Sequence, residues 1–290
     1  MAGDNPPMSP RPIDVWNAGT FDQDLTALLE ENADLIQAYM HRDHEIFLSY
    51  DHYSGPNRPL TRPDNPYATR FYAFQETVGE QMQARVIRAF HYTRMTDAEI
   101  AILHREGIQL STPETLRARL DALVATGSLS PDASFVLYDA SPFQSDQRAA
   151  RSNKFWMISH PLAINDSGVE PLMSHWGGEV ASMWMREPDI LARLASIGSA
   201  RILELAVPVS ATNQSYSAGK AVVATFGRSR GCMPDKHAFD LYTFRPLPPE
   251  SVLNVHSEGE PNFFRMAQGY PAEFVDVSVG RWKELTGEND

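Results

Sequence analysis

The stretch VIRAFHYTR, residues 86–94, indicates the fold of this chain more clearly than any other segment. Its apolar residues predict a buried strand, and polar side chains gather at the end of that strand. The residues from Thr96 to Glu99 then have the pattern of a capping box, which predicts a helix that begins at once. Ligand sites in mixed α/β domains are often built where a strand ends and a helix begins, so this junction is the first candidate for a functional site.

Other segments predict a domain with many strands and with its helices near the beginning. The helix at 97–106 should end at Gly107, and a hydroxyl cap before Pro113 predicts a second helix that closes at Gly127. We predict further strands at residues 135–138, 155–158, 171–176, 201–207, 221–226, 239–244, 252–256 and 274–279. This order of elements favours an α+β fold over a strictly alternating α/β fold.

The composition along the chain predicts four regions. The first residues are polar and rich in proline, and we expect residues 1–20 to form a disordered tail. Residues 21–84 are expected to form a helical and loop layer, and residues 85–280 the α+β domain. Residues 281–290 are expected to be a flexible C-terminus.

The chain has 290 residues, a formal net charge of −12 and a single cysteine. A surface of this charge repels nucleic acid, so a nucleic-acid partner would need a local basic patch. The arginines between residues 58 and 94 are the best candidates for such a patch, although we favour a solvated surface there. No apolar run approaches the roughly 20 residues that span a bilayer, so we expect no membrane partner. The lone thiol and the lack of a secretory signal in the first residues suit a cytoplasmic protein.

The first candidate site consists of His91, Tyr92, Thr93 and Arg94. A histidine at the end of a strand can bond to a ribose hydroxyl, transfer protons or bind a metal ion. The alternative is a histidine held by a backbone carbonyl, with Tyr92 in the core, and the sequence leaves both interpretations open. We expect two other histidines, His104 and His256, to lie on solvated faces.

The second candidate site is the string His175-Trp176-Gly177-Gly178-Glu179. Two glycines allow a ligand or another backbone to approach closely, and Trp176 can stack on an aromatic ring. Glu179 is also a favourable residue for the first turn of a helix, so a purely structural role stays open.

Asp240 is the third candidate, because it begins the apolar strand predicted at 239–244. A carboxylate at this position can be a catalytic acid or a strand cap. The loop before it, residues 227–232, is basic and suits an anion, although we favour solvent exposure for it.

These three segments together resemble the ADP-ribosyltransferase superfamily, whose fold is shared by diphtheria-toxin-like enzymes. That family opens with a strand ending in His-Gly-Thr or similar residues before a helix, and residues 90–93, Phe-His-Tyr-Thr, are similar. Its middle motif, a strand running into a short helix, is similar to residues 172–184, and its final carboxylate resembles Asp240. The resemblance covers residues 85–256 and implies an ADP-ribosyltransferase-like split β-sheet core.

The chain departs from the family pattern at two positions. Asp240 stands where the family usually has glutamate, and His175-Trp176 stands where it usually has tyrosine. Either departure implies altered chemistry or lost activity, unless Glu179 supplies the missing carboxylate.

The resemblance implies that NAD is the substrate, and that the enzyme transfers ADP-ribose to an unknown macromolecular acceptor or cleaves NAD. Breaking the nicotinamide–ribose bond produces an oxocarbenium-like cation. Asp240 or Glu179 would be the catalytic residue that stabilises this charge.

The other candidate residues would bind the dinucleotide. The resemblance implies that His91 holds a ribose and that Arg94 pairs with the pyrophosphate. Tyr92 or Trp176 would stack on the nicotinamide. Thr93 and His175 complete the predicted binding residues.

Two other functions stay open at this point. One is a catalytically inactive binding or interaction protein on the same fold, which the departures from the family pattern favour. The other is a hydrolase in which His91, His175 and Glu179 surround a metal ion. The NAD hypothesis requires that an imidazole, a flat ring and an acid from three distant segments line one hollow.

Overall fold

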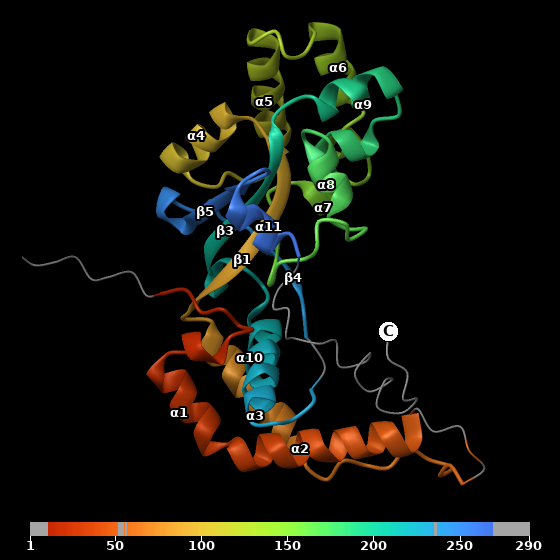
Figure 1. Ribbon diagram of the computed structural model, residues 1–290, viewed down its shortest axis with the longest axis vertical. Helices are drawn as coiled ribbons and strands as arrows, with labels where there is room; N and C mark the ends of the chain where they lie inside the picture. Colours follow the sequence, from red (N-terminus) through yellow and green to blue (C-terminus); the bar gives the residue numbers. More distant parts are fainter. Residues whose placement is uncertain (1–10, 52–54, 56, 235–236, 269–290) are drawn as a thin grey trace, which may run out of the picture. The chain divides into compact units, whose positions relative to one another are not determined.

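The computed structural model describes residues 11–51, 55, 57–234 and 237–268, which divide into two compact units (Figure 1). Among these residues, unit 1 comprises 11–51, 55, 57–87, 208–234 and 237–239, and unit 2 comprises 88–207 and 240–268. The strand predicted at 274–279, the flexible C-terminus at 281–290 and the first ten residues of the predicted tail lie outside the described residues.

Unit 1 is helical in its described part. Asp22 starts its first α-helix by accepting a hydrogen bond from the backbone nitrogen of Leu25 at 2.8 Å. The elements are η1 (Ala18–Thr20), α1 (Gln23–Glu31), α2 (Ala33–Ile46), the π-helical turn η2 (Phe47–Asp51), α3 (Ala68–Met82), η6 (Val209–Ala211) and α10 (Ser215–Ser229).

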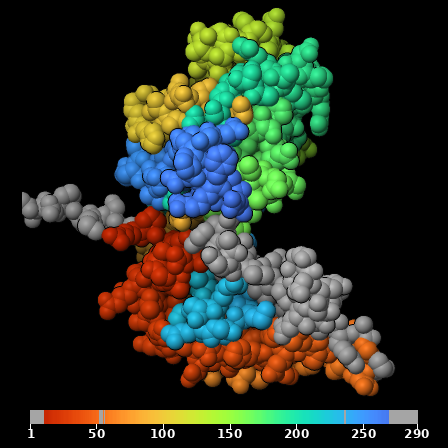
Figure 2. All heavy atoms as spheres, in the orientation of Figure 1, coloured from red at the N-terminus to blue at the C-terminus, as the bar shows by residue number. Residues whose placement is uncertain are grey.

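Two glycines allow α3 and α10 to pack closely. A Cβ atom on Gly219 of α10 would lie 2.6 Å from the backbone nitrogen of Gly79 on α3, so α10 has no room for a side chain there. A Cβ atom on Gly79 would lie 3.1 Å from the Cα of Tyr216, which is a tight contact. In Figures 1 and 2 the cyan α10 lies among the red and orange N-terminal helices. Residues 208–239, which we expected within the 85–280 domain, therefore group with unit 1.

The strand predicted at 221–226 is wrong, because these residues form the middle of α10. Every residue from Ala221 to Gly227 is buried, so the run is apolar around the whole helix. Continuous apolar runs of this length occur in buried strands and in buried helices, and periodicity does not distinguish them.

Residues 11–20 of the predicted tail are folded within unit 1. The backbone nitrogen of Ile13 donates to the carbonyl of Val86 at 2.9 Å, and Ile13, Val15 and Trp16 are buried. The sequence prediction gave more weight to the prolines than to these three apolar side chains, whose burial stabilises the segment.

Unit 2 is built on one open antiparallel sheet of five strands in the order β4-β2-β1-β3-β5, so the α+β class is confirmed. The resemblance implied a split sheet, whereas the described strands form a single one. The first two residues of β1 and the last of β3 belong to unit 1. The strands, all of them predicted, are β1 (Val86–Met95), β2 (Phe155–Ile158), β3 (Ser199–Pro208), β4 (Asp240–Thr243) and β5 (Val252–Ser257).

Helices surround this sheet. The predicted capping box is confirmed, since Glu99 accepts from the backbone nitrogen of Thr96 at 2.8 Å. The elements are α4 (Asp97–Glu106), α5 (Pro113–Ala125), α6 (Pro131–Asp139), η3 (Pro142–Gln144), α7 (Arg148–Arg151), α8 (Glu170–Ser174), η4 (Gly178–Val180), η5 (Ser182–Trp184), α9 (Pro188–Ala195), η7 (Pro249–Ser251) and α11 (Pro261–Met266).

Two more strand predictions are wrong, because residues 135–138 lie in α6 and most of residues 171–176 in α8. Ser130 caps α6 by accepting from the backbone nitrogen of Ala133, and Pro131 follows it in the first turn. This serine–proline pair is a helix-start signal that outweighs the β propensity of the aromatic residues after it.

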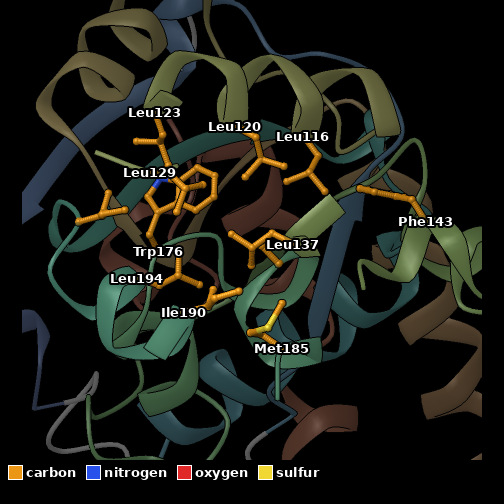
Figure 3. Close-up of a cluster of buried hydrophobic side chains, with 12 residues drawn as sticks. Leu116, Leu120, Leu123, Leu129, Leu137, Phe143, Trp176, Met185, Ile190 and Leu194 are labelled. Carbon is orange, nitrogen blue, oxygen red and sulfur yellow. The ribbon is translucent and has the colours of Figure 1, made fainter. Parts of the chain in front are cut away.

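Two hydrophobic clusters hold unit 2 together. One gathers side chains of α5, α6 and α9 around the fully buried Trp176 (Figure 3). The other packs Phe90 and Tyr92 of β1 against Met173 of α8 and Phe263 of α11. In Figure 2 the blue residues of β5 and α11 accordingly lie directly against green residues.

A buried ionic network crosses three strands of the sheet. Glu204 of β3 accepts from Arg88 at 2.6 Å, from Asn254 at 3.0 Å and lies 3.0 Å from Nε2 of His256. His256 is 5% exposed, so its predicted place on a solvated face is wrong. Burial raises the pKa of Glu204. The hydrogen bond with His256 and the charge of Arg88 outweigh this effect and lower the pKa to about 2.

We expect this carboxylate to make the stability of the protein depend on acidic pH. The pKa of Glu204 is lower in the folded state than in the unfolded state, so its contribution is complete above the unfolded pKa and is lost as the pH falls. The free energy of unfolding should drop by about 2 to 3 kcal/mol for this group between about pH 5 and pH 2. Urea unfolding across that range measures the drop.

Two variants distinguish the contribution of Glu204 to this pH dependence from that of the other carboxyl groups. Glu204→Gln should show a smaller drop than the wild type, whereas Glu250→Gln, at an exposed position, should keep the wild-type drop. Equal pH dependence in Glu204→Gln and the wild type would contradict the assignment.

Candidate functional site

His91 lies within β1, which continues to Met95, so its predicted place at the end of the strand is wrong. The side chain is held by the backbone of the neighbouring strand β2. Its Nδ1 lies 2.8 Å from the carbonyl oxygen of Trp156, and its ring centroid lies 4.4 Å from that of Phe155. Burial, together with the charge of Arg119, lowers the pKa of His91 to about 4, so the imidazole is neutral at neutral pH. A neutral ring that donates from Nδ1 has only an acceptor left at Nε2, which can receive a hydrogen bond from a ligand hydroxyl.

The other predicted binding residues on β1 are engaged within the protein. The Tyr92 hydroxyl donates to the carbonyl of Leu162 at 3.1 Å, and the ring is buried. Thr93 is also buried, and Nε of Arg94 donates to the carbonyl of Ile197 at 3.0 Å. Stacking on nicotinamide by Tyr92 and pairing of Arg94 with a pyrophosphate, as the resemblance implied, do not match this geometry.

Trp176 is completely buried and belongs to an internal polar cluster. Its Nε1 donates to Oε2 of Glu99 at 2.9 Å, and Nε of Arg119 donates to Oε1 of the same carboxylate at 2.7 Å. Burial raises the pKa of Glu99, but the charge of Arg119 and these hydrogen bonds outweigh burial and leave that pKa lowered. Figure 3 shows Trp176 among leucine side chains, so the predicted stacking of this ring on a ligand is corrected.

The glycines after Trp176 make a turn. Gly177 has a φ of 86°, and a Cβ atom there would lie 2.6 Å from the Cβ of Ala181. Gly178 also has a positive φ, at 45°. The two glycines thus allow the chain to turn tightly and to place Glu179 in η4, and this accounts for both of them without a ligand.

The turn brings Glu179 close to Asp240, and we call these two residues the acidic pair. Burial and the charge of Asp240 raise the pKa of Glu179, against the effect of Arg151, whose Nη1 lies 2.7 Å from Oε1 of Glu179. Burial also raises the pKa of Asp240. Residues 61 positions apart in the sequence therefore interact as like charges, which favours retention of a proton by one of them.

Trp156 and Tyr242, which the sequence analysis did not single out, form an aromatic pair on the same face of the sheet as Asp240. Trp156 lies opposite Tyr242 in the β2–β4 register, and their ring centroids are 4.7 Å apart. Asp240 is two residues before Tyr242 on β4, so both side chains project from one face. The Lys154 ammonium lies 4.9 Å from the centroid of the Tyr242 ring.

Three polar atoms in the segment that leads into β2 are buried and have no hydrogen-bond partner: Nε of Arg151, Oγ of Ser152 and Nε1 of Trp156. Each of them can donate a hydrogen bond. Buried donors without an acceptor are costly, and a cluster of them suits an anionic or polar ligand. A charged residue stands two positions before an aromatic one both at Lys154 and Trp156 and at Asp240 and Tyr242, and this spacing was the signal in the sequence that could have indicated the arrangement.

His91 does not face the acidic pair. Phe90 lies opposite Ile158 on β2, and Ile158 lies opposite Asp240 on β4, so these three side chains share one face of the sheet. His91 is the next residue along β1 and projects from the other face. The predicted hollow lined by an imidazole, a flat ring and an acid is therefore corrected: Glu179 and Asp240 come together, and His91 and Trp176 lie elsewhere.

The remaining candidate, His175, is partly exposed at the end of α8. Within the described residues, no group of three or more His, Cys, Asp or Glu side chains is placed to hold a metal ion, so His91, His175 and Glu179 are not gathered as the hydrolase hypothesis requires. Among the helices that the structure describes, none combines the length and the apolar character needed to cross a membrane.

Comparison with known proteins gives no relative: no family model matches the chain, and neither a curated protein nor a solved structure is significantly similar to it.

Proposed function

We propose that the protein binds NAD at the acidic and aromatic pairs and cleaves its nicotinamide–ribose bond, releasing ADP-ribose to water or to a macromolecular acceptor. The observation that carries this proposal is the convergence of Glu179 and Asp240, both with raised pKa values, beside the rings of Trp156 and Tyr242. Acids with perturbed pKa values next to partly exposed aromatic rings are typical of sites that act on ring-containing substrates.

Each part of the arrangement has a task in that reaction. The C–N bond breaks with its electron pair going to the nicotinamide nitrogen, and positive charge develops on the ribose. An ionised carboxylate of the acidic pair stabilises that charge. The aromatic pair offers a surface for a flat ring, and Arg151 and Lys154 offer positive charge to the phosphates.

The orientation of His91 favours a second candidate function, in which the protein binds NAD without cleaving it. In the proposed site no described imidazole joins the acidic pair, and Glu179 is already paired with Arg151. One experiment distinguishes the two candidates. The full chain is titrated with NAD by calorimetry and then incubated with it, and released nicotinamide is separated by chromatography.

Binding together with nicotinamide release supports the enzyme, and binding alone supports the second candidate. The absence of binding contradicts both. Trp156→Leu should weaken NAD binding about tenfold, because loss of ring stacking costs on the order of 1–3 kcal/mol. Phe135→Leu, an exposed aromatic residue on α6, is the control and should bind as the wild type does.

A further inference from the structure

A cavity of about 380 Å³ lies within unit 1, which contains none of the residues of the proposed NAD site. Its volume is in the range of small-molecule sites. The walls come from α2, η2, α3 and α10 together with Arg62, Met233, Pro234 and His237. The residues that the following argument uses are Asp43, Asp51, Arg62, Gln75, Lys220 and Met233.

Gln75 places an unsatisfied amide at this cavity. The residue is 3% exposed, and its Oε1 is buried without a hydrogen-bond partner. A buried acceptor without a donor costs free energy, so the position is explained if a bound molecule supplies an N–H or O–H group. The residue is also polar on a helix face otherwise occupied by Phe71, Phe74 and Val78.

The cavity has charges of both signs. On one side Arg62 lies 3.1 Å from Asp51 and 3.6 Å from Asp43, so this group of three has a net charge of −1. On α10, Lys220 makes no ion pair with any residue that the structure describes, and its ammonium lies 5.9 Å from the centroid of the Tyr216 ring. The four charges sum to zero, which suits a ligand that also carries one charge of each sign.

Tyr39, Tyr72 and His237 add polar groups to the wall, and another part of it is apolar. Met40, Phe47, Phe71, Ala224 and Met233 line it. Methionine side chains adapt to ligands of different shape, and the phenylalanine rings add apolar area. An apolar group of several carbon atoms therefore fits between the charged sides.

We propose that this cavity binds a zwitterionic amino acid with an apolar side chain. The ammonium group donates to Oε1 of Gln75 and is balanced by the side that carries Asp43 and Asp51. The carboxylate pairs with Lys220, and the side chain packs against the methionine and phenylalanine wall. This site is independent of the proposed NAD chemistry, because all its residues belong to unit 1.

Three related ligands, compared for binding to the wild-type chain, test the proposal. L-phenylalanine is the probe, and binding is measured by calorimetry. 3-Phenylpropionate lacks the ammonium group and 2-phenylethylamine lacks the carboxylate, so each should bind about tenfold more weakly or worse. Equal binding of either comparator, or no binding of L-phenylalanine, overturns the proposal.

Variants test the residues. Gln75→Met keeps the size of the side chain but removes the acceptor, and Lys220→Met removes the cation. Each should weaken L-phenylalanine binding about tenfold. Gln83→Met is the matched control, because Gln83 is exposed at the end of the same helix, and it should bind as the wild type does. Wild-type binding by Gln75→Met or Lys220→Met overturns the assignment, and circular dichroism verifies that each variant is folded.

Discussion

Glu179→Gln should lower the rate of nicotinamide release from NAD by about 100-fold or more, because a neutral amide cannot stabilise the positive charge that develops on the ribose. The substitution keeps the size of the side chain and an oxygen that can accept from Arg151, which lies 2.7 Å away in the wild type. The effect should therefore fall on kcat more than on KM. Chromatography of nicotinamide at saturating NAD measures it.

The interaction between Glu179 and Asp240 also predicts the effect of replacing the second carboxylate. Asp240→Asn should also slow nicotinamide release, and it removes the negative charge that raises the pKa of Glu179. The pH at which activity rises should accordingly shift downwards in this variant. Glu187→Gln, at an exposed glutamate just before α9, is the control. Undiminished release in both Glu179→Gln and Asp240→Asn would remove the acidic pair from the reaction.

Trp176→Ala should lower the free energy of unfolding by about 3 to 5 kcal/mol, which is the range for removing a large aromatic side chain from a core. Trp176 is 0% exposed and lies beside Leu129 and Leu194 in the cluster of Figure 3. The change also removes the donor to Glu99 and the ring over which the Arg119 guanidinium lies, at 4.6 Å from the ring centroid. Urea unfolding followed by circular dichroism measures the loss.

Two comparisons identify the cause of that loss. Phe135→Ala truncates an aromatic side chain that is 65% exposed, and it should change the free energy of unfolding by about 0.5 kcal/mol at most. Trp176→Phe keeps most of the apolar volume and removes the indole donor, so it should be intermediate. A loss in Trp176→Ala no greater than that in Phe135→Ala would show that the ring does not stabilise unit 2.

Local sequence patterns were sufficient to predict where helices begin, because a few neighbouring residues determine a helix start. The capping box at Thr96 and the proline after Thr112 give helix starts that the structure confirms. Short apolar runs were not sufficient to distinguish strands from helices. The segments within α6 and α10 both have strand-like composition. A local serine–proline signal makes the first helical, whereas the second is buried on all sides and periodicity could not distinguish it from a strand.

In the candidate site, local patterns likewise identified single residues, whereas contacts that depend on strand pairing could not be predicted. Glu179 and Asp240 were identified from their positions at element starts, and the structure brings them together. The aromatic pair was missed, because the contact of Trp156 with Tyr242 depends on the register of β2 against β4. The face on which His91 lies likewise depends on the pairing of Phe90 with Ile158, which one sequence does not give.

The close contact between Gly79 and Gly219 has a consequence for synthesis of the chain. The ribosome completes α3 long before it reaches α10, so the first helices wait for about 130 residues before their partner emerges, given that the chain grows from its N-terminus. During that interval α3 can pack against α2 but lacks the helix that contacts Gly79 in the folded protein. Unit 2 is interrupted in turn by the segment that completes unit 1, so neither unit is synthesised as one continuous stretch of chain.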